Sequence, residues 1–332
     1  MNKPGRQDGV AVITALLLTT LAVSIVASLF WQQQVQVRTM ENQRLQLQTK
    51  WILRGALDWA TVVLRQDAYT SQWTSLDQVW ATPLAETRLD QYIERERLAG
   101  ESYDATLSGN ITDAMSRYNL RNLAENGVPQ EAEIANFKRL LQVLQLDQGL
   151  AQRVAFMVAS GQPREVKPPE EGGGTPQPAG AAPVQVPAGT LPMPIMRVDD
   201  LLAVPGFKPE IVEKLRPFVV VLPARTKVNV NTAPAEVLAA MLPGGSLSEA
   251  NGLVQQRKRA PWRGVSYFTA QTTHPPDDAE QVLDVKSYWF LIDSRIRLDR
   301  AALNSQALVE RVQGSGLTPL SNQIVVRWVR QN

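Results

Sequence analysis

The chain has 332 residues, a length that allows two or more folding units, and its composition of 44% hydrophobic and 20% charged residues is ordinary for a folded protein. Its 34 Lys and Arg side chains nearly balance 32 Asp and Glu, and the formal charge of +2 gives no overall electrostatic reason to expect a nucleic-acid partner. The absence of cysteine excludes disulfides, thiol catalysis and thiolate metal sites. The single histidine, His274, lies between Thr273 and Pro275 and is expected to be a surface loop residue.

The N-terminus joins a short polar segment to a long apolar one. Lys3 and Arg6 lie in the polar segment, which ends at Gly9, and the next 21 residues, Val10–Phe30, carry no charge. A helix of that length rises about 30 Å, which is the thickness of a bilayer core. The positive-inside rule then places the N-terminus in the cytoplasm and the remainder outside.

Three interpretations of this segment compete: a secretory signal peptide, an uncleaved signal anchor, and a prepilin-type leader cut between Gly9 and Val10. The third is favoured because the helical pattern continues beyond the membrane. No Pro or Gly occurs after Phe30 until Gly55, and apolar residues recur at helical spacing. These are Leu45, Ile52, Leu53, Ala56, Leu57, Trp59, Ala60, Val63 and Leu64. The pattern predicts one helix of some fifty residues, apolar first and amphipathic later, whose second half packs on a globular head.

The next hundred residues mix strand and helix signals. We expect partial helix over Leu84–Leu98. Two alternating runs, Tyr103–Ser108 and Ile111–Tyr118, flank Gly109-Asn110 and predict a β-hairpin. Apolar spacing then predicts helix between Pro129 and Ser160.

Residues 161–196 contain nine Pro and six Gly and no aromatic residue, a composition typical of a disordered loop. Two short helices are predicted after it, Arg197–Ala203 and Pro209–Leu215.

Further helices are expected around Val237–Leu242, with Thr232 or Asn231 as N-cap, and over Glu249–Arg259, capped by Ser248.

The C-terminal part returns to a period of two. Alternation over Val282–Arg300, Ala302–Val312 and Gln323–Arg330 predicts an antiparallel meander. Strand signals therefore occur before and after a helical block. The sequence predicts an α+β fold with one antiparallel sheet interrupted by a helical insertion.

At this point the chain resembles a known family, the minor pseudopilin K of the type II (general) secretion pathway. The resemblance rests on five motifs in order along the chain: the Gly9–Val10 junction with its apolar helix, Leu53–Trp59, Leu107–Ala114 with Arg117–Leu123, Val228–Ala233 and Val285–Phe290. It implies a pilin fold with a large helical insertion made of two sterile-alpha-motif-like (SAM-like) pieces. It also implies that the prepilin peptidase cleaves before Val10 and methylates the new N-terminus. The mature protein would then lie in the bacterial inner membrane with its head in the periplasm.

The resemblance further implies assembly with the minor pseudopilins I and J and the other pseudopilins of the filament, in a tip that starts the pseudopilus. The resulting division of the chain is a leader at 1–9, a transmembrane helix at 10–30, a pilin helix and first strands at 31–119, a first helical unit at 120–222, a second at 223–280 and C-terminal strands at 281–332.

Thr14 is the fifth residue after the predicted cleavage site, where most members of the wider pilin family carry a Glu. Such a carboxylate is costly in a bilayer and is retained because it pairs with a neighbouring subunit's terminal amine. A threonine avoids that cost but cannot neutralise an amine. Val10 could still offer its own amine to a Glu from the subunit below, so Thr14 indicates a subunit at the end of a filament, as in the K family.

A membrane-anchored DNA-binding component of a competence or type IV pilus system is the alternative function. The tracts Val204–Lys208 and Leu242–Ser246 resemble helix–hairpin–helix turns, near the cations Arg257–Arg259 and Arg263. Lys208 and Ser246 stand where the second glycine of such turns is expected, and the cations are expected on a solvated helix end, so nucleic acid is not expected as a partner.

Four acidic residues invite a calcium hypothesis, which the resemblance also allows: Asp277, Asp278, Glu280 and Asp284. Their spacing fits no defined ligand loop, and a solvated acidic loop is the simpler interpretation, so no cofactor is required. Asn229 and Asn231 are expected to make turn and cap hydrogen bonds. The sequence holds no nucleophile–base pairing or phosphate loop, and we expect no enzyme.

Overall fold

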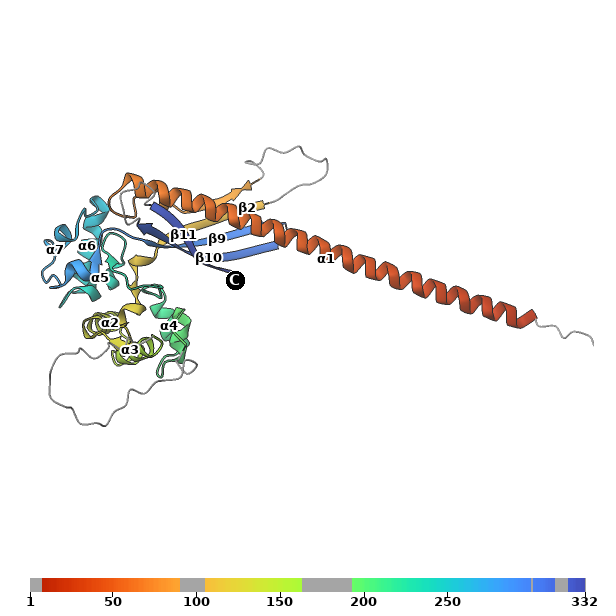
Figure 1. The fold of residues 1–332 in the computed structure, drawn as a ribbon, viewed down its shortest axis with the longest axis horizontal. Helices are drawn as coiled ribbons and strands as arrows, with labels where there is room; N and C mark the ends of the chain where they lie inside the picture. The colour runs from red at the N-terminus through yellow and green to blue at the C-terminus, as the bar shows by residue number, and fades with distance from the viewer. Residues whose placement is uncertain (1–7, 90–104, 163–192, 300, 314–321, 332) are drawn as a thin grey trace, which may run out of the picture.

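The computed structural model describes residues 8–89, 105–162, 193–299, 301–313 and 322–331. A single helix, α1 (Asp8–Thr70), extends far beyond a head made of an antiparallel sheet and short helices (Figure 1). The predicted long helix is confirmed, and at 63 residues it is longer than expected. The predicted disordered loop lies, apart from its ends, outside the described residues.

The second half of α1 packs on the sheet. Its buried face carries Leu53, Leu57, Ala60 and Leu64, spaced three or four residues apart as one helix face requires. This face shares a hydrophobic cluster with sheet residues: Phe290, Ile292, Ile296, Ala307, Val309 and Ile324. Trp59 was expected to join the packed face, but it is 54% exposed and lies at the border of that face, where it lines a groove with Leu107 and Ile292 of the sheet.

Five antiparallel strands form the sheet in the order β1-β2-β9-β10-β11. They are β1 (Leu84–Arg88), β2 (Ala105–Asp113), β9 (Trp289–Leu298), β10 (Ala301–Gln313) and β11 (Asn322–Gln331). Strands β2 and β9 are neighbours although the whole helical block separates them in sequence. This arrangement confirms the predicted meander and the predicted α+β fold with a helical insertion.

The predicted hairpin around Gly109-Asn110 is wrong, because both residues lie inside the single strand β2. Gly109 pairs with Ser294 of β9, and a Cβ atom on it would meet the carbonyl oxygen of Asp293 at 2.5 Å. The glycine therefore serves a close approach of two backbones and makes no turn. The expected partial helix after Leu84 is also wrong over Leu84–Arg88, where pairing with β2 makes a strand.

The inserted block contains α2 (Glu131–Val143), α3 (Leu150–Ser160), the 3-10 helix η5 (Val198–Ala203), α4 (Pro209–Leu215), α5 (Ala235–Met241), α6 (Leu247–Arg259), α7 (Val265–Thr269) and α8 (Ala279–Val282). Short strand pairs connect it: β3 (Tyr118–Asn119) with β6 (Val219–Val220), β4 (Ala124–Glu125) with β5 (Val128–Pro129), and β7 (Val228–Asn229) with β8 (Leu283–Asp284). Helices α2–α4 and α5–α7 form two groups in Figure 1, and one hydrophobic cluster runs through both. The division at residue 222 and the sterile-alpha-motif-like character of the pieces stay predictions.

Two predicted helix caps are wrong. Helix α5 has Pro234 as its N-cap, and α6 has Ser246, whose hydroxyl accepts a hydrogen bond from the Glu249 amide at 3.0 Å. Thr232 and Asn231 are unavailable as caps because their side chains bond to distant residues, Asp113 and Trp262.

Replacing Gly109 with Ala should lower the free energy of unfolding by about 1–3 kcal/mol, because the new methyl group forces β2 and β9 apart. Gly55 of α1 is the matched control, since a Cβ there meets nothing within 4 Å. Gly55→Ala should be neutral or stabilise by up to about 1 kcal/mol, because Ala favours the helix. Urea unfolding of the detergent-solubilised chain measures both. Equal responses would contradict the close approach at Gly109.

Candidate functional site

The first half of α1 is apolar, and its described side chains are exposed from Ala11 to Phe30. Leu16, Leu18 and Phe30 are 60%, 67% and 68% exposed. Within the described residues this is the one helix long and apolar enough to cross a membrane, and no residue of its most apolar window is buried. So large an apolar surface is stable only where lipid or other subunits cover it.

The predicted processing residues lie in the first turns of this helix. Gly9 and Val10 follow its first residue, Asp8, and the cleavage between them stays a prediction. One turn later the Thr14 hydroxyl donates to the carbonyl oxygen of Ala11 at 3.0 Å. Such a bond keeps a hydroxyl satisfied in an apolar environment without adding a charge.

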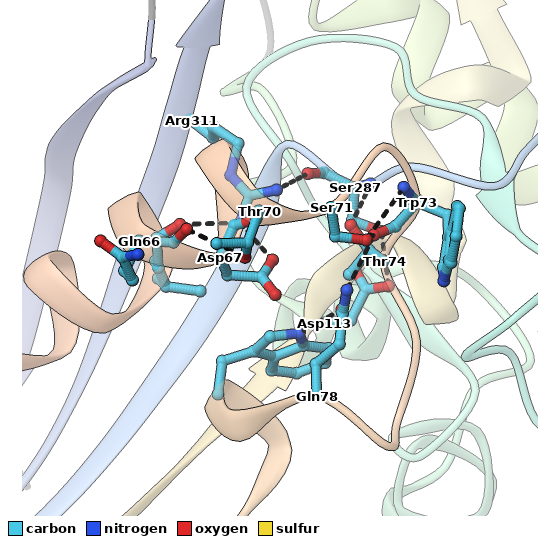
Figure 2. A network of polar contacts seen from close by, with 12 residues as sticks. Gln66, Asp67, Thr70, Ser71, Trp73, Thr74, Gln78, Asp113, Ser287 and Arg311 are labelled. Carbon is cyan, nitrogen blue, oxygen red and sulfur yellow. Dashed lines mark hydrogen bonds and ion pairs between the residues drawn. The ribbon is translucent and has the colours of Figure 1, made fainter.

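The other end of α1 is held to the head by a buried ion pair that the sequence does not reveal. Arg311 of β10 donates to the Asp67 carboxylate at 3.1 Å (Figure 2). It also donates to the Leu64 carbonyl at 3.0 Å. Its side chain is 1% exposed and that of Asp67 is 8% exposed. The guanidinium also lies 5.0 Å from the centre of the Phe290 ring.

Burial is costly to both charges of this pair. Loss of solvent raises the pKa of Asp67 above its ordinary value, although Arg311 acts in the opposite sense. Burial likewise lowers the pKa of Arg311. Its Nε atom has no hydrogen-bond partner among the described residues. Removing one partner of such a pair leaves an uncompensated buried charge, so the two residues depend on each other.

A second buried carboxylate, Asp113, joins the sheet to the inserted block at the end of β2. Its Oδ2 accepts from the hydroxyls of Thr232 and Ser287 at 2.5 and 2.6 Å and from the side-chain amide of Asn229 at 3.1 Å. Its Oδ1 accepts from the backbone of Met115 at 2.8 Å. Burial raises the pKa of Asp113, and these donors oppose the shift.

Thr74, just after α1, links the membrane helix to the same network. Its backbone amide donates to the Val285 carbonyl at 2.8 Å, and its carbonyl accepts from the side-chain amide of Asn229 at 3.0 Å. Its hydroxyl accepts from the Ser287 amide at 3.1 Å. The segments after α1, at the end of β2, at β7 and before β9 therefore meet at one junction, part of which Figure 2 shows.

The two asparagines of the Val228–Ala233 motif make the expected turn bonds and more. The Asn229 side chain accepts from the Asn231 amide at 2.9 Å, which confirms the turn role. Asn231 also exchanges two hydrogen bonds with the backbone of Trp262. Sequence reasoning missed Asp67, Asp113 and Arg311, whose only signal was the occurrence of charges in otherwise apolar or alternating segments.

The calcium hypothesis stays a prediction. Among the described residues no group of three or more His, Asp or Glu side chains comes together. The Asp284 carboxylate already accepts from the backbone amides of Val285 and Lys286 at 2.8 and 3.1 Å. His274, as predicted, is an exposed loop residue.

The basic cluster that suggested DNA binding was expected to lie on a solvated helix end. This expectation is wrong for one of its cations. Arg257 is buried and donates to the Val230 carbonyl at 2.7 Å, where burial lowers its pKa to about 10. Arg263 lies over the Trp73 ring at 5.5 Å. Lys258, Arg259 and Arg263 remain exposed.

Comparison with known proteins gives a consistent result. Two family models, both described as type II secretion system (T2SS) protein K, match residues 116–224 and 228–286, together about half of the chain. Type II secretion system protein K of Pectobacterium carotovorum subsp. carotovorum is 26% identical over 320 residues, covering 92% of each chain. The protein of that name from Pseudomonas aeruginosa is 28% identical over 277 residues, covering 80% of this chain and 77% of the relative.

Among solved structures, a chain of the GspK-GspI-GspJ complex from the type 2 secretion system of enterotoxigenic Escherichia coli has a similar fold. The TM-score is 0.64 at 19% identity, and the match covers 89% of this chain and 99% of that one. At this identity the likeness is one of fold.

Arg311→Met should lower the free energy of unfolding by about 3–5 kcal/mol, because Asp67 is left buried without its partner. Combining it with Asp67→Asn should restore at least about 1 kcal/mol, since the two residues are coupled. The matched control is Arg327→Met on β11, whose ion pair with Glu310 is half exposed and should contribute less than about 1 kcal/mol. Chemical unfolding of these three variants and of Asp67→Asn alone gives all four values, and additive losses in the double variant would contradict the coupling.

Proposed function

Because the chain belongs to the family of type II secretion system protein K, the minor pseudopilins K, we propose that it initiates assembly of the secretion pseudopilus from the filament tip. It acts through assembly and performs no catalysis. Its task is to support the export of folded proteins across the outer membrane.

The observation that carries this proposal is the division of α1 into two halves. The second half is built into the head by Leu53, Leu57 and Leu64 and by the Asp67–Arg311 pair. The first half is apolar, and its described side chains from Ala11 to Phe30 are exposed. A subunit of this form must find lipid before assembly and neighbouring helices after it.

Position in the filament follows from charge at the start of α1. After cleavage at Gly9, Val10 would offer its amine to a Glu of the subunit below. Thr14 cannot neutralise the amine of a subunit above, because a hydroxyl carries no charge. A subunit with this asymmetry ends a filament, and it requires no cofactor.

The chain is membrane-anchored through a single helix, and we infer its orientation from Lys3 and Arg6. These cations favour a cytoplasmic N-terminus and a periplasmic head in the bacterial inner membrane. The proposed partners are the minor pseudopilins I and J and the other pseudopilins. The Escherichia coli structure of similar fold is that of a GspK-GspI-GspJ complex, which supports this choice.

Processing is the first test. Co-expression with a prepilin peptidase should shift the mature N-terminus to Val10 and methylate it, and Gly9→Val should block the shift because a branched side chain crowds the scissile peptide. Intact-mass spectrometry measures both. Retention of residues 1–9 beside an active peptidase would exclude the pilin mode of assembly.

Position 14 tests the tip assignment. In a strain lacking the native protein, Thr14→Ala and Thr14→Leu should restore secretion and pseudopilus number. Thr14→Glu should give no gain, since an unpaired carboxylate costs roughly 2.5–3.5 kcal/mol near a membrane helix centre and less toward its end. Failure of Thr14→Ala together with full activity of Thr14→Glu would show a subunit of the filament body.

A further inference from the structure

A cavity of about 530 Å³ lies between the sheet and the inserted block, on the face of the sheet opposite α1. Leu291 and Trp328 form its sheet wall, and they belong to the hydrophobic cluster that α1 does not touch. The segments around η5 and α4 form the other wall. The cavity is separate from the membrane helix and from the junction at Asp113.

Four arginines line the cavity against a single carboxylate, Asp199: Arg117, Arg197, Arg216 and Arg330. Arg216 is already neutralised, because it donates to Asp199 at 2.6 Å and to Glu213 at 2.7 Å. The cations left for a ligand are therefore Arg117, Arg197 and Arg330.

Arg117 is the most confined of these cations. It is half-buried, and within the described part of the chain its guanidinium makes no hydrogen bond or ion pair. Burial lowers the pKa of Arg117, and the negative charges of Asp293 and Asp113 oppose this shift only in part. A desolvated guanidinium without a bound acceptor gains most from an anionic ligand.

Arg330 is held in a position to bind a ligand. Its guanidinium lies 4.0 Å from the centre of the Trp328 ring, and it donates to the Met196 carbonyl at 3.3 Å. Arg197 and Arg330 line the same cavity. Burial lowers the pKa of Arg330 and the positive charge of Arg197 adds to the effect, whereas Asp200 and Asp199 oppose it. An anion between the two arginines would relieve their repulsion.

We propose that this cavity binds an acidic segment of a partner protein, with its carboxylates on Arg117, Arg197 and Arg330 and an apolar side chain against Trp328. The combination of Arg, Trp and Met in one half-enclosed surface is typical of protein–protein contact centres. A free phosphate would leave the apolar wall unused. A lipid headgroup is disfavoured because β9, β11 and α4, which carry or adjoin the lining residues, lie in the head, away from the exposed apolar half of α1 (Figure 1).

Binding can be measured on the full chain in dodecyl maltoside micelles. The probe is a rhodamine-labelled hexapeptide, Glu-Leu-Glu-Glu-Leu-Glu, followed by fluorescence anisotropy, with a peptide of Lys in place of Glu as its counterpart. Arg117→Gln and Arg330→Gln should each weaken binding of the acidic peptide at least about fivefold, equivalent to about 1 kcal/mol. Arg330→Lys should lose less than Arg330→Gln, because it keeps the charge.

The control variant is Arg297→Gln on β9, which is outside the cavity and 60% exposed and should bind like the wild type. Thermal unfolding checks that each variant is folded. If Arg117→Gln does not fold, the result for Arg330→Gln decides the outcome. The proposal is overturned if the cavity variants bind like Arg297→Gln, if the Lys peptide binds equally well, or if no saturable binding occurs below about 1 mM. If millimolar inorganic phosphate displaces the acidic peptide, and a peptide with Ala in place of Leu binds equally well, the cavity is a simple anion site and the proposal is also overturned.

Discussion

The attachment of the membrane helix to the head depends on one buried arginine. Arg311 reaches from β10 to the last turns of α1, where it bonds to Asp67 and to the backbone at Leu64. Apolar packing alone would allow the helix to slide, because the hydrophobic effect is not directional. A buried ion pair fixes one register, since any other arrangement leaves two charges without partners.

This pair is continuous with the junction that holds the inserted block. The backbone amide of Arg311 donates to Tyr288 at 2.7 Å, one residue from Ser287, whose hydroxyl bonds to Asp113. Thr74 connects the same place to the end of α1. Membrane helix, sheet and inserted helices are thus fixed to one another within a short distance, which suits a subunit that must hold neighbours through its head while its helix remains in a membrane.

The two faces of the sheet serve different purposes. Phe290 and Ile292 point to α1, whereas Trp289 and Leu291 point to the inserted block, and all four are buried. The insertion therefore covers a face that would otherwise be exposed, and it leaves the arginine-lined cavity at its border. Contacts made through α1 and contacts made at the cavity can form independently, because different elements supply them.

The sequence by itself determined the features that depend on local periodicity. The uncharged run after Gly9, the helical spacing from Leu53 to Leu64 and the alternation from Val282 onward fixed a long helix, a membrane segment and an antiparallel meander, because such patterns reflect which face of one element is covered. Only the tertiary structure decided the rest. Gly109 reads locally as a turn, but it is required because the Asp293 carbonyl of β9 approaches it. Asp67, Asp113 and Arg311 are ordinary charges in sequence and become one junction only when segments more than a hundred residues apart meet, since no local pattern records which partner will neutralise a buried charge.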